Sequence, residues 1–171
     1  MGEDSKGGRI VVGVDDSPGG RAALAHALRE GSLRGARVEV LGAFTRPEFW
    51  AGEAIPGWSM VPDVEEIRAA VDAHLHRVVN EVREEVGADA SGVTVLVHVV
   101  AGSAAAALLG SARNADLLVV GSRGRGGFTS MVLGSVSLQC VLHAPCPVTV
   151  VPASAVGGDQ DARPRASAAA Y

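Results

Sequence analysis

A glycine-rich stretch between residues 117 and 137 has the residue types and the spacing of a phosphate-binding loop. It opens with an apolar run, Leu117 to Val120, which is typical of a buried strand. Five glycines lie from Gly121 to Gly134, among arginines, serines and a threonine, and an apolar periodic segment begins at Val132. A strand, a loop of glycines, cations and hydroxyls, and a helix start form a recurrent arrangement for holding phosphate.

Glycine suits such a loop for two physical reasons. Positive φ angles turn successive N–H groups inward, and the missing Cβ lets phosphate oxygens approach. Gly134 and Ser135 lie at the start of the last predicted helix, where free N–H groups and the helix dipole favour an anion. The hydroxyls of Ser135 and Ser137 can add hydrogen bonds. The charges of Arg123 and Arg125 make both arginines candidate phosphate partners.

Other phosphate and RNA motifs do not fit this stretch. The chain has no GxxxxGK-S/T sequence, so the loop is not a P-loop. Residues 124–127 lack the GxGxxG spacing and follow the fourth predicted strand instead of the first. An RGG-type RNA-binding tract would be repeated, and here it is single. On the local residues alone, a loop that binds nothing remains the alternative.

A second group of ligand-type residues, Asp15-Asp16-Ser17, follows the first predicted strand, Arg9 to Val14. Ser17 is a favourable N-cap, and Pro18 suits the first helical position because its missing N–H costs nothing there. In open parallel sheets, ligands bind past the carboxyl ends of the strands, where the strand order reverses. If this turn and the glycine stretch serve one ligand, the first and fourth strands must be neighbours.

The chain reads as alternating strands and helices. The predicted strands are Arg9 to Val14, Arg37 to Phe44, Val93 to Val100, Leu117 to Val120 and Val148 to Val151. The predicted helices run from the cap Ser17 to near Gly35, from Asp63 to Gly87, from Gly102-Ser103 to Ala112, and from Val132 to before Pro145. This order predicts an α/β fold, a doubly wound, Rossmann-like, five-stranded parallel sheet in the order 3-2-1-4-5 with helices on both faces. The Val- and Leu-rich third strand is typical of a sheet interior.

Composition limits the domain count and the function class. The 171 residues favour one domain, residues 9–152, with a flexible N-terminus over residues 1–8 and a disordered tail over residues 153–171. A net charge of −4 argues against nucleic-acid binding. No apolar run approaches the ~20 residues of a membrane span. The N-terminus has no apolar signal region, so we expect a cytoplasmic protein.

Three further features have a structural and a functional interpretation. Cys140 and Cys146 fit neither a CxxC motif nor a zinc site, so we expect structural thiols, with a redox switch as the alternative. The stretch 45–62 is long for a loop inside one domain and holds both tryptophans, which favours packing on the surface over a lid. His74 and His76 are expected to be solvated.

The spacing Gly121-x2-Gly124-x9-Gly134-Ser135, after the lead-in VVGSRG, resembles the nucleotide-binding signature of the universal stress protein family. The segments VVGVDDSP and APCPVTVVP are similar to the family's first and last strands. The resemblance covers Arg9 to Pro152. It implies a nucleotide-binding α/β fold that dimerises, often through its last strand, here Val148 to Val151, and that binds ATP in some members but not others. Members that bind ATP, with Mg²⁺, keep the glycine pattern, and this chain keeps it whole.

Residue roles follow from that resemblance by position. Asp15 would contact the ribose or a phosphate-bound metal, and the backbones of Ala43 and Val120 would meet the adenine. Gly121 would lie beside the ribose, and Gly124, Gly134 and Ser135 would take the phosphates. The complete set of expected nucleotide-binding residues is Asp15, Ser17, Ala43, Val120, Gly121, Arg123, Gly124, Arg125, Gly134, Ser135, Val136 and Ser137.

One departure from the family pattern is Asp16, at a position that is often glycine in the family. A second carboxylate there would repel a triphosphate unless Mg²⁺ intervenes or the side chain points to solvent. The favoured function is therefore an ATP-binding, nucleotide-sensing dimer of the stress response with little or no catalysis. A slow ATPase or nucleotide-dependent transferase is one alternative, with Asp16 and His26 as the nearby candidates for a general base. A nucleotide-free dimeric interaction protein is the other.

Overall fold

The computed structural model describes residues 7–45, 63–124 and 133–156. The elements in chain order are β1 (Arg9–Gly13), α1 (Pro18–Arg34), β2 (Arg37–Phe44), α2 (Val64–Val86), η3 (Gly87–Ala90), β3 (Val95–Ala101), α3 (Ala104–Ala112), β4 (Leu117–Gly121), α4 (Ser135–His143), β5 (Val148–Val151) and η4 (Ala153–Val156). The η elements are short 3₁₀ helices. Among the described residues, no helix combines the length and the apolar character needed to cross a membrane.

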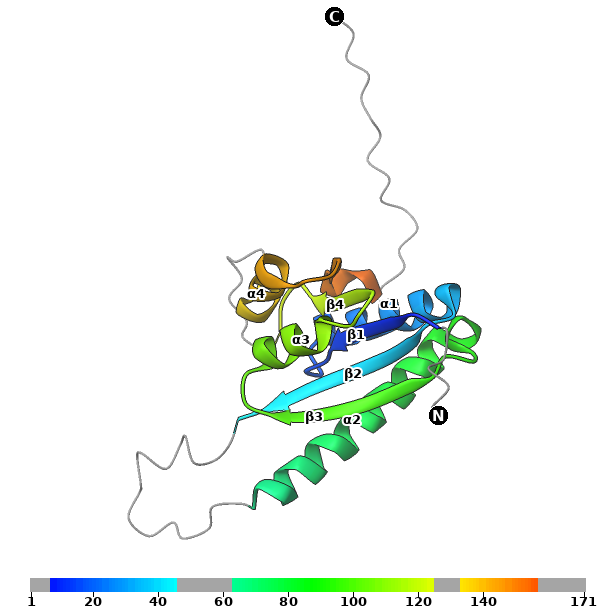
Figure 1. The fold of residues 1–171 in the computed structure, drawn as a ribbon. Coiled ribbons are helices and arrows are strands. Elements are labelled where there is room, and N and C mark those ends of the chain that lie inside the picture. The colour runs from blue at the N-terminus through cyan, green and yellow to red at the C-terminus, as the bar shows by residue number, and fades with distance from the viewer. Residues whose placement is uncertain (1–6, 46–62, 125–132, 157–171) are drawn as a thin grey trace, which may run out of the picture.

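The strands form one five-stranded parallel sheet in the order β3-β2-β1-β4-β5 (Figure 1). This confirms the predicted fold class and the predicted strand order. β1 pairs with β2 on one side and with β4 on the other, where Ile10 lies opposite Leu117 and Val12 opposite Val119. The carboxyl ends of β1 and β4 are therefore side by side, as one shared ligand site requires.

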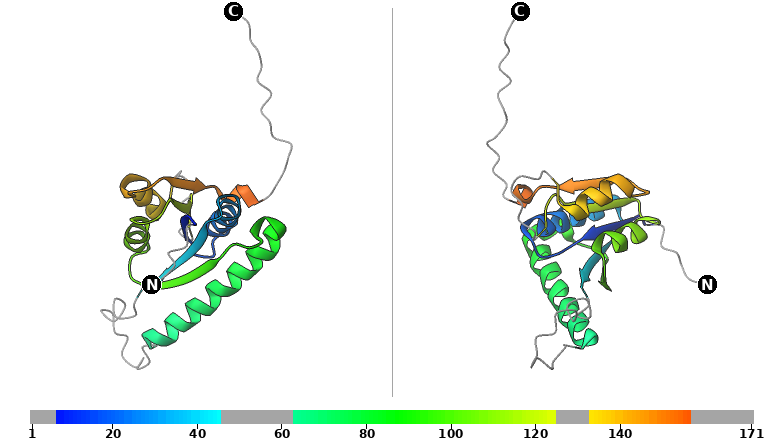
Figure 2. Two further views of the ribbon diagram at one scale, coloured as in Figure 1. Left: turned by 45° about the vertical axis from the view of Figure 1, so that its right-hand side comes forward. Right: turned by 90° about the vertical axis from the view of Figure 1, so that its left-hand side faces the viewer.

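Helices cover both faces of the sheet (Figure 2). Strand side chains alternate between the two faces, so Ile10 and Val12 pack in a core with α1 and α2, whereas Val11 packs in a second core with α3 and α4. Sequence signals set the helix ends. Ser17 accepts a backbone N–H at the start of α1, as predicted from its type, and Ser103 does the same at the start of α3.

The third strand differs from its prediction in place and in environment. β3 begins at Val95, two residues later than expected, because η3 and a turn with Gly92 at φ 75° use the preceding residues. The expectation of an interior strand is wrong, because β3 is an edge of the sheet and Leu96 is 42 % exposed. Burial on one face and solvent on the other explains the alternation of half-buried and exposed residues along β3.

Three other expectations concern segments that lie partly or wholly outside the described residues. The last helix is described from Ser135 onward, and Val132, where it was expected to begin, lies outside the described residues. The stretch expected to be a tail begins with η4, which packs against α1, and residues 157–171 lie outside the described part. Residues 46–62, with both tryptophans, also lie outside it.

An ion pair lies on the α3 side of the sheet, near the amino ends of the strands. Glu39 carries a charge on β2, an interior strand of the sheet, yet it is only 7 % exposed. The Arg9 guanidinium donates to both carboxylate oxygens, at 2.7 and 2.5 Å, and Arg37 adds a third bond at 3.1 Å. These bonds, above all those from Arg9, hold the pKa of the Glu39 carboxyl below its usual range despite its burial.

Candidate functional site

The turn after β1 and the loop after β4 are packed together at the carboxyl edge of the sheet. The contact is backbone against backbone: a Cβ placed on Gly121 would lie 2.5 Å from the carbonyl carbon of Gly19, at the start of α1. A Cβ on Gly19 would in turn collide with the carbonyl oxygen of Arg123. Glycine is needed at both positions because no side chain fits between α1 and the 121–124 loop.

The carboxylate of Asp15 is oriented by the cap of α1. Ser17 accepts from the Gly20 N–H at 3.0 Å, and its own hydroxyl donates to Oδ1 of Asp15 at 2.5 Å. The Ser17 N–H donates to the same oxygen at 3.1 Å. The other oxygen, Oδ2, lies beside Gly124, where a Cβ would collide with it. Ser17 thus acts through Asp15, whose carboxylate is turned to the glycine loop.

The loop is also tied to β5 and α4. The Ser122 N–H donates to the Val151 carbonyl at 2.7 Å, and the Gly134 N–H donates to the Ser122 carbonyl at 2.8 Å. Ser137 is buried, and its hydroxyl donates to the Gly121 carbonyl at 2.6 Å. The expected ligand contact through the Ser137 hydroxyl is therefore revised, because that proton is used within the protein. Its place in the structure is to join α4 to the end of β4.

The first turn of α4 leaves N–H groups open. Its N-cap residue, Gly134, has no side chain to accept them, and the first intrahelical bond recorded runs from Leu138 to Gly134. Within the described part of the chain, the N–H groups of Ser135, Val136 and Ser137 have no acceptor. Such a turn favours an anion by its free donors and by the helix dipole.

Asp16, the departure from the family pattern, is held against α1 and α2. Its backbone is left-handed, with φ 60°, which explains why glycine suits this position. One carboxylate oxygen lies 3.5 Å from an Arg21 nitrogen, and the other lies 2.9 Å from Nε2 of His74. Nε2 of His74 makes no hydrogen bond within the described part of the chain, whereas its Nδ1 lies 2.7 Å from an Arg77 nitrogen. His74, expected to be solvated, is half-buried.

The candidate bases do not come together. Asp16 is engaged by Arg21 and His74. His26 lies about 12 Å along α1 from Pro18, at 1.5 Å of rise per residue. Elsewhere at the carboxyl edge, Ala43 is half-buried in β2 and Val120 is buried at the end of β4.

Of the two arginines in the glycine stretch, Arg123 is exposed, whereas Arg125 lies outside the described residues. Metal ligands are sparse at the carboxyl edge. Over residues 7–45, 63–124 and 133–156, no group of three His, Cys, Asp or Glu side chains is arranged to hold a metal ion. A cation here would rest on Asp15 and on the ligand itself, which fits nucleotide-bound Mg²⁺ and does not fit a metal held by protein alone.

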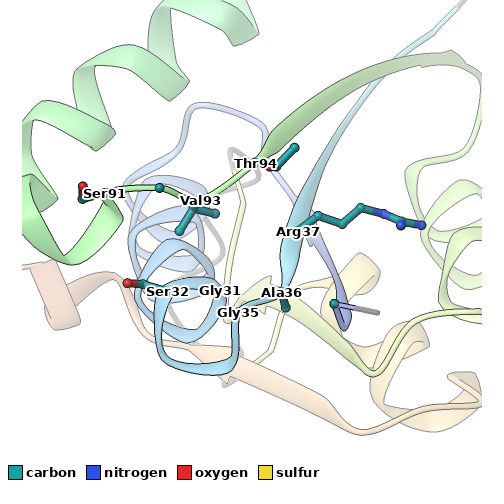
Figure 3. Close-up of a pocket in the computed structure, with 10 residues that line it drawn as sticks. Gly31, Ser32, Gly35, Ala36, Arg37, Ser91, Val93 and Thr94 are labelled. Atoms are coloured by element: carbon teal, nitrogen blue, oxygen red, sulfur yellow. The ribbon is translucent and has the colours of Figure 1, made fainter. Parts of the chain in front are cut away.

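A cavity of about 300 Å³ lies at the opposite end, near the amino ends of β2 and β3 (Figure 3). Sequence reasoning did not identify it. Hydroxyls of Ser32, Ser91 and Thr94 contribute to its lining, but the Arg37 side chain extends away from Ser32 and Ser91. None of the expected nucleotide-binding residues is among the described residues that line this cavity, so we place the candidate site at the carboxyl edge.

Comparison with known proteins assigns the family. A profile of the Universal stress protein family matches residues 7–152. A universal stress protein of Thermus aquaticus is 34 % identical over 148 residues, covering 83 % of this chain and 96 % of the relative. One from Mycobacterium tuberculosis is 32 % identical over 142 residues, covering 83 % of this chain and 46 % of the relative. The chain therefore spans about half the length of the mycobacterial relatives it matches.

Solved structures share the fold at lower identity. UspA of Lactobacillus plantarum has a TM-score of 0.66 at 22 % identity, covering 86 % of this chain and 99 % of its own. A universal stress protein in complex with cAMP has a TM-score of 0.61 at 24 % identity, covering 88 % and 100 %. One from Archaeoglobus fulgidus in complex with dAMP has a TM-score of 0.56 at 24 % identity, covering 84 % and 97 %. The chain belongs to the universal stress protein family.

Proposed function

We propose that this protein binds ATP, with Mg²⁺, across the carboxyl ends of β1 and β4 and acts as a nucleotide-sensing regulator. The observation that carries the proposal is the packing of the Asp15 turn against the 121–124 loop, with the open N–H groups of α4 beside them. This arrangement offers one carboxylate for a metal-bound or ribose oxygen and several donors for phosphate. Two neighbouring structures are complexes with cAMP and dAMP, which supports an adenine nucleotide.

The proposed roles separate direct contacts from positioning. The N–H groups of Ser135 and Val136 face the phosphates, with Gly124 leaving room and Arg123 supplying charge. The backbones of Ala43 and Val120 border the adenine, a role taken from the family. Ser17 and Ser137 orient the site through their bonds to Asp15 and Gly121. Arg125 remains a proposed phosphate partner.

Asp16 is held against α1 and α2, and its charge is only partly offset there. One carboxylate oxygen lies 3.5 Å from an Arg21 nitrogen, but Arg21 also donates from two nitrogens to Glu81, so two carboxylates share this cation. The repulsion that the sequence suggests is therefore reduced, and we propose that Mg²⁺ accompanies the nucleotide without a ligand from Asp16.

We also propose a cytoplasmic homodimer that forms through β5. Edge strands present unpaired peptide groups, and β5 is an edge with Val148 and Val150 half-buried. On the neighbouring α4, Leu138, Val141 and Leu142 are 45, 45 and 65 % exposed. A second copy would cover these apolar side chains while the strands pair.

Replacing Gly124 with alanine tests the proposed site. The new methyl group meets Oδ2 of Asp15 and forces the carboxylate out of its orientation. We expect the affinity for Mg·ATP to fall at least about tenfold, roughly the loss of one hydrogen bond to a charged group. The fold should remain intact, because a side-chain oxygen is the group that must move. Isothermal titration calorimetry measures the change.

Gly110→Ala is the matched control, because Gly110 is exposed in α3 and a Cβ there meets nothing within 4 Å. It should bind as the unmodified protein does. Equal affinities of the two variants for Mg·ATP would show that the nucleotide does not bind beside Asp15.

A further inference from the structure

The two edges of the sheet, β3 and β5, differ in how their outward peptide groups are used. In β3 the inward groups are those of even-numbered residues, since Val38 N–H donates to the Thr94 carbonyl at 2.9 Å and Gly102 N–H to the Phe44 carbonyl at 2.8 Å. The N–H and C=O of one residue point to the same side of a strand and alternate along it. The groups of Val95, Val97 and Val99 therefore face outward.

Two arginines of α2 reach this outward edge. An Arg68 nitrogen donates to the Val99 carbonyl at 3.2 Å, and an Arg83 nitrogen donates to the Val93 carbonyl, just before β3, at 2.6 Å. The helix between the arginines rises about 22 Å at 1.5 Å per residue. The strand from Val93 to Val99 rises about 20 Å at 3.3 Å per residue. The helix and the strand edge are therefore matched in length and run in opposite directions.

At the β5 edge, the described residues provide no arginine in such a position. There the inward groups are those of odd-numbered residues, since Leu118 N–H donates to the Pro147 carbonyl at 2.9 Å and Ser122 N–H to the Val151 carbonyl at 2.7 Å. The peptide groups of Val148 and Val150 face outward. Within the described ranges, no side chain donates to either of them.

We infer that Arg68 and Arg83, which bond one carbonyl at each end of the β3 edge, hinder strand pairing there and so confine self-association of this protein to the β5 edge. The partner is a second copy of the chain, and the inference rests on the proposed dimer. Two copies paired through β5 by a two-fold axis place their β3 edges at the two outer ends. If these outer edges were open, they would pair with further copies end to end. Repeated pairing of this kind gives an open-ended assembly and not a closed dimer.

Each arginine suits this role by its chemistry. A guanidinium donates several bonds, cannot lose its proton near neutral pH and places charge on the edge, and an approaching strand would have to displace it. Arg68 also lies 3.6 Å from Glu65, which keeps its side chain along the helix. Methionine is the matched replacement, since it keeps an unbranched apolar stem but donates no hydrogen bond.

The test is the mass of Arg68→Met/Arg83→Met as a function of protein concentration, by light scattering on eluting protein. The unmodified chain should reach a limiting mass, and the double variant should continue to gain mass at concentrations where the unmodified chain has stopped. Arg77→Met, an exposed position of the same helix, should match the unmodified chain. An unchanged mass for the double variant, with an unchanged circular dichroism spectrum, would overturn the inference.

Two further variants separate this inference from the dimer proposal and from misfolding. Val150→Pro removes an outward N–H of β5 and should make the otherwise unmodified chain monomeric. When Arg68→Met and Arg83→Met are added to the Val150→Pro variant, the protein should again form dimers. With β5 blocked, these dimers can form only through β3. A monomeric unmodified chain would refute the proposed dimer alone. Arg68→Met by itself, at a half-exposed side chain, repeats the test if the double variant does not fold.

Discussion

Gly121→Ala is expected to destabilise the protein by about 3 kcal/mol, the upper range for overpacking at a site that cannot relax. The new methyl group would lie 2.5 Å from the carbonyl carbon and 2.6 Å from the carbonyl oxygen of Gly19. Both are backbone atoms of the first turn of α1, so no side-chain rotation relieves the contact. β4 and α1 must separate, and that movement also displaces the loop that carries Gly124. Urea denaturation of the variant and the unmodified protein measures the difference.

Two glycine variants serve as controls for this result. Gly110→Ala lies within α3 with free space around its Cβ and should stabilise the protein by about 0.5–1 kcal/mol, since alanine favours helix over glycine. A Cβ on Gly42 would contact the end of the flexible Leu75 side chain, so Gly42→Ala should cost less than Gly121→Ala. A Gly121→Ala protein as stable as the unmodified chain would contradict the described packing of α1 on β4.

Glu39→Gln is expected to cost about 2 kcal/mol at neutral pH, because it removes one charge of a buried pair and leaves the other. Arg9 would keep its charge and lose the bidentate carboxylate. Arg37 would lose its partner as well. The amide of glutamine replaces only part of the bonding. Chemical denaturation at neutral pH measures this cost.

The pH dependence follows from the lowered pKa of Glu39. In the unfolded chain the group titrates near 4.5, and in the folded protein donation from Arg9 lowers its pKa. A lowered pKa stabilises the fold above the unfolded value, and this contribution is lost as pH falls through the folded value. The unmodified protein should therefore lose stability below about pH 4.5 more steeply than Glu39→Gln does. Glu84→Gln, an exposed change on α2, should leave the slope unaltered. Parallel curves for Glu39→Gln and the unmodified protein would contradict the assigned ion pair.

The sheet order followed from the sequence because two separate clues agreed. Alternating strand and helix patterns require parallel crossovers, and ligand-type residues after the first and fourth strands require those strands to be neighbours. The environment of β3 was misjudged from its composition. Its apolar run resembles an interior strand, although the predicted order already places it at the sheet edge, where Leu96 is exposed.

The site residues were recognisable by type, but their partners were not. Ser137 carries a hydroxyl at a helix start, and a sequence cannot show that the proton goes to the Gly121 carbonyl, which lies 2.6 Å away. Asp16 looked unfavourable for phosphate because the sequence does not show where its carboxylate lies. In the structure this carboxylate contacts Arg21 in α1 and His74, which is far along the chain in α2.

For the glycines as well, the sequence predicts the function of the stretch, but only the structure shows which contacts require glycine. Their spacing indicates phosphate binding, yet Gly121 is required by the backbone of Gly19 and Gly124 by the carboxylate of Asp15. These contacts join segments about a hundred residues apart in the sequence, which no local pattern encodes. The α2 arginines reach the β3 edge over shorter separations in sequence, 31 and 10 residues, and no local pattern indicates these contacts either.

Calorimetric titration with Mg·ATP of the purified protein, freed of any copurified nucleotide, tests directly whether ATP binds at the carboxyl edge of the sheet. We expect saturable binding of one nucleotide per chain, with affinity reduced in Gly124→Ala and retained in Gly110→Ala. Analysis of nucleotide released from protein purified without added ligand should identify an adenine nucleotide. Absence of binding at millimolar Mg·ATP, for a protein shown to be folded, would contradict the account.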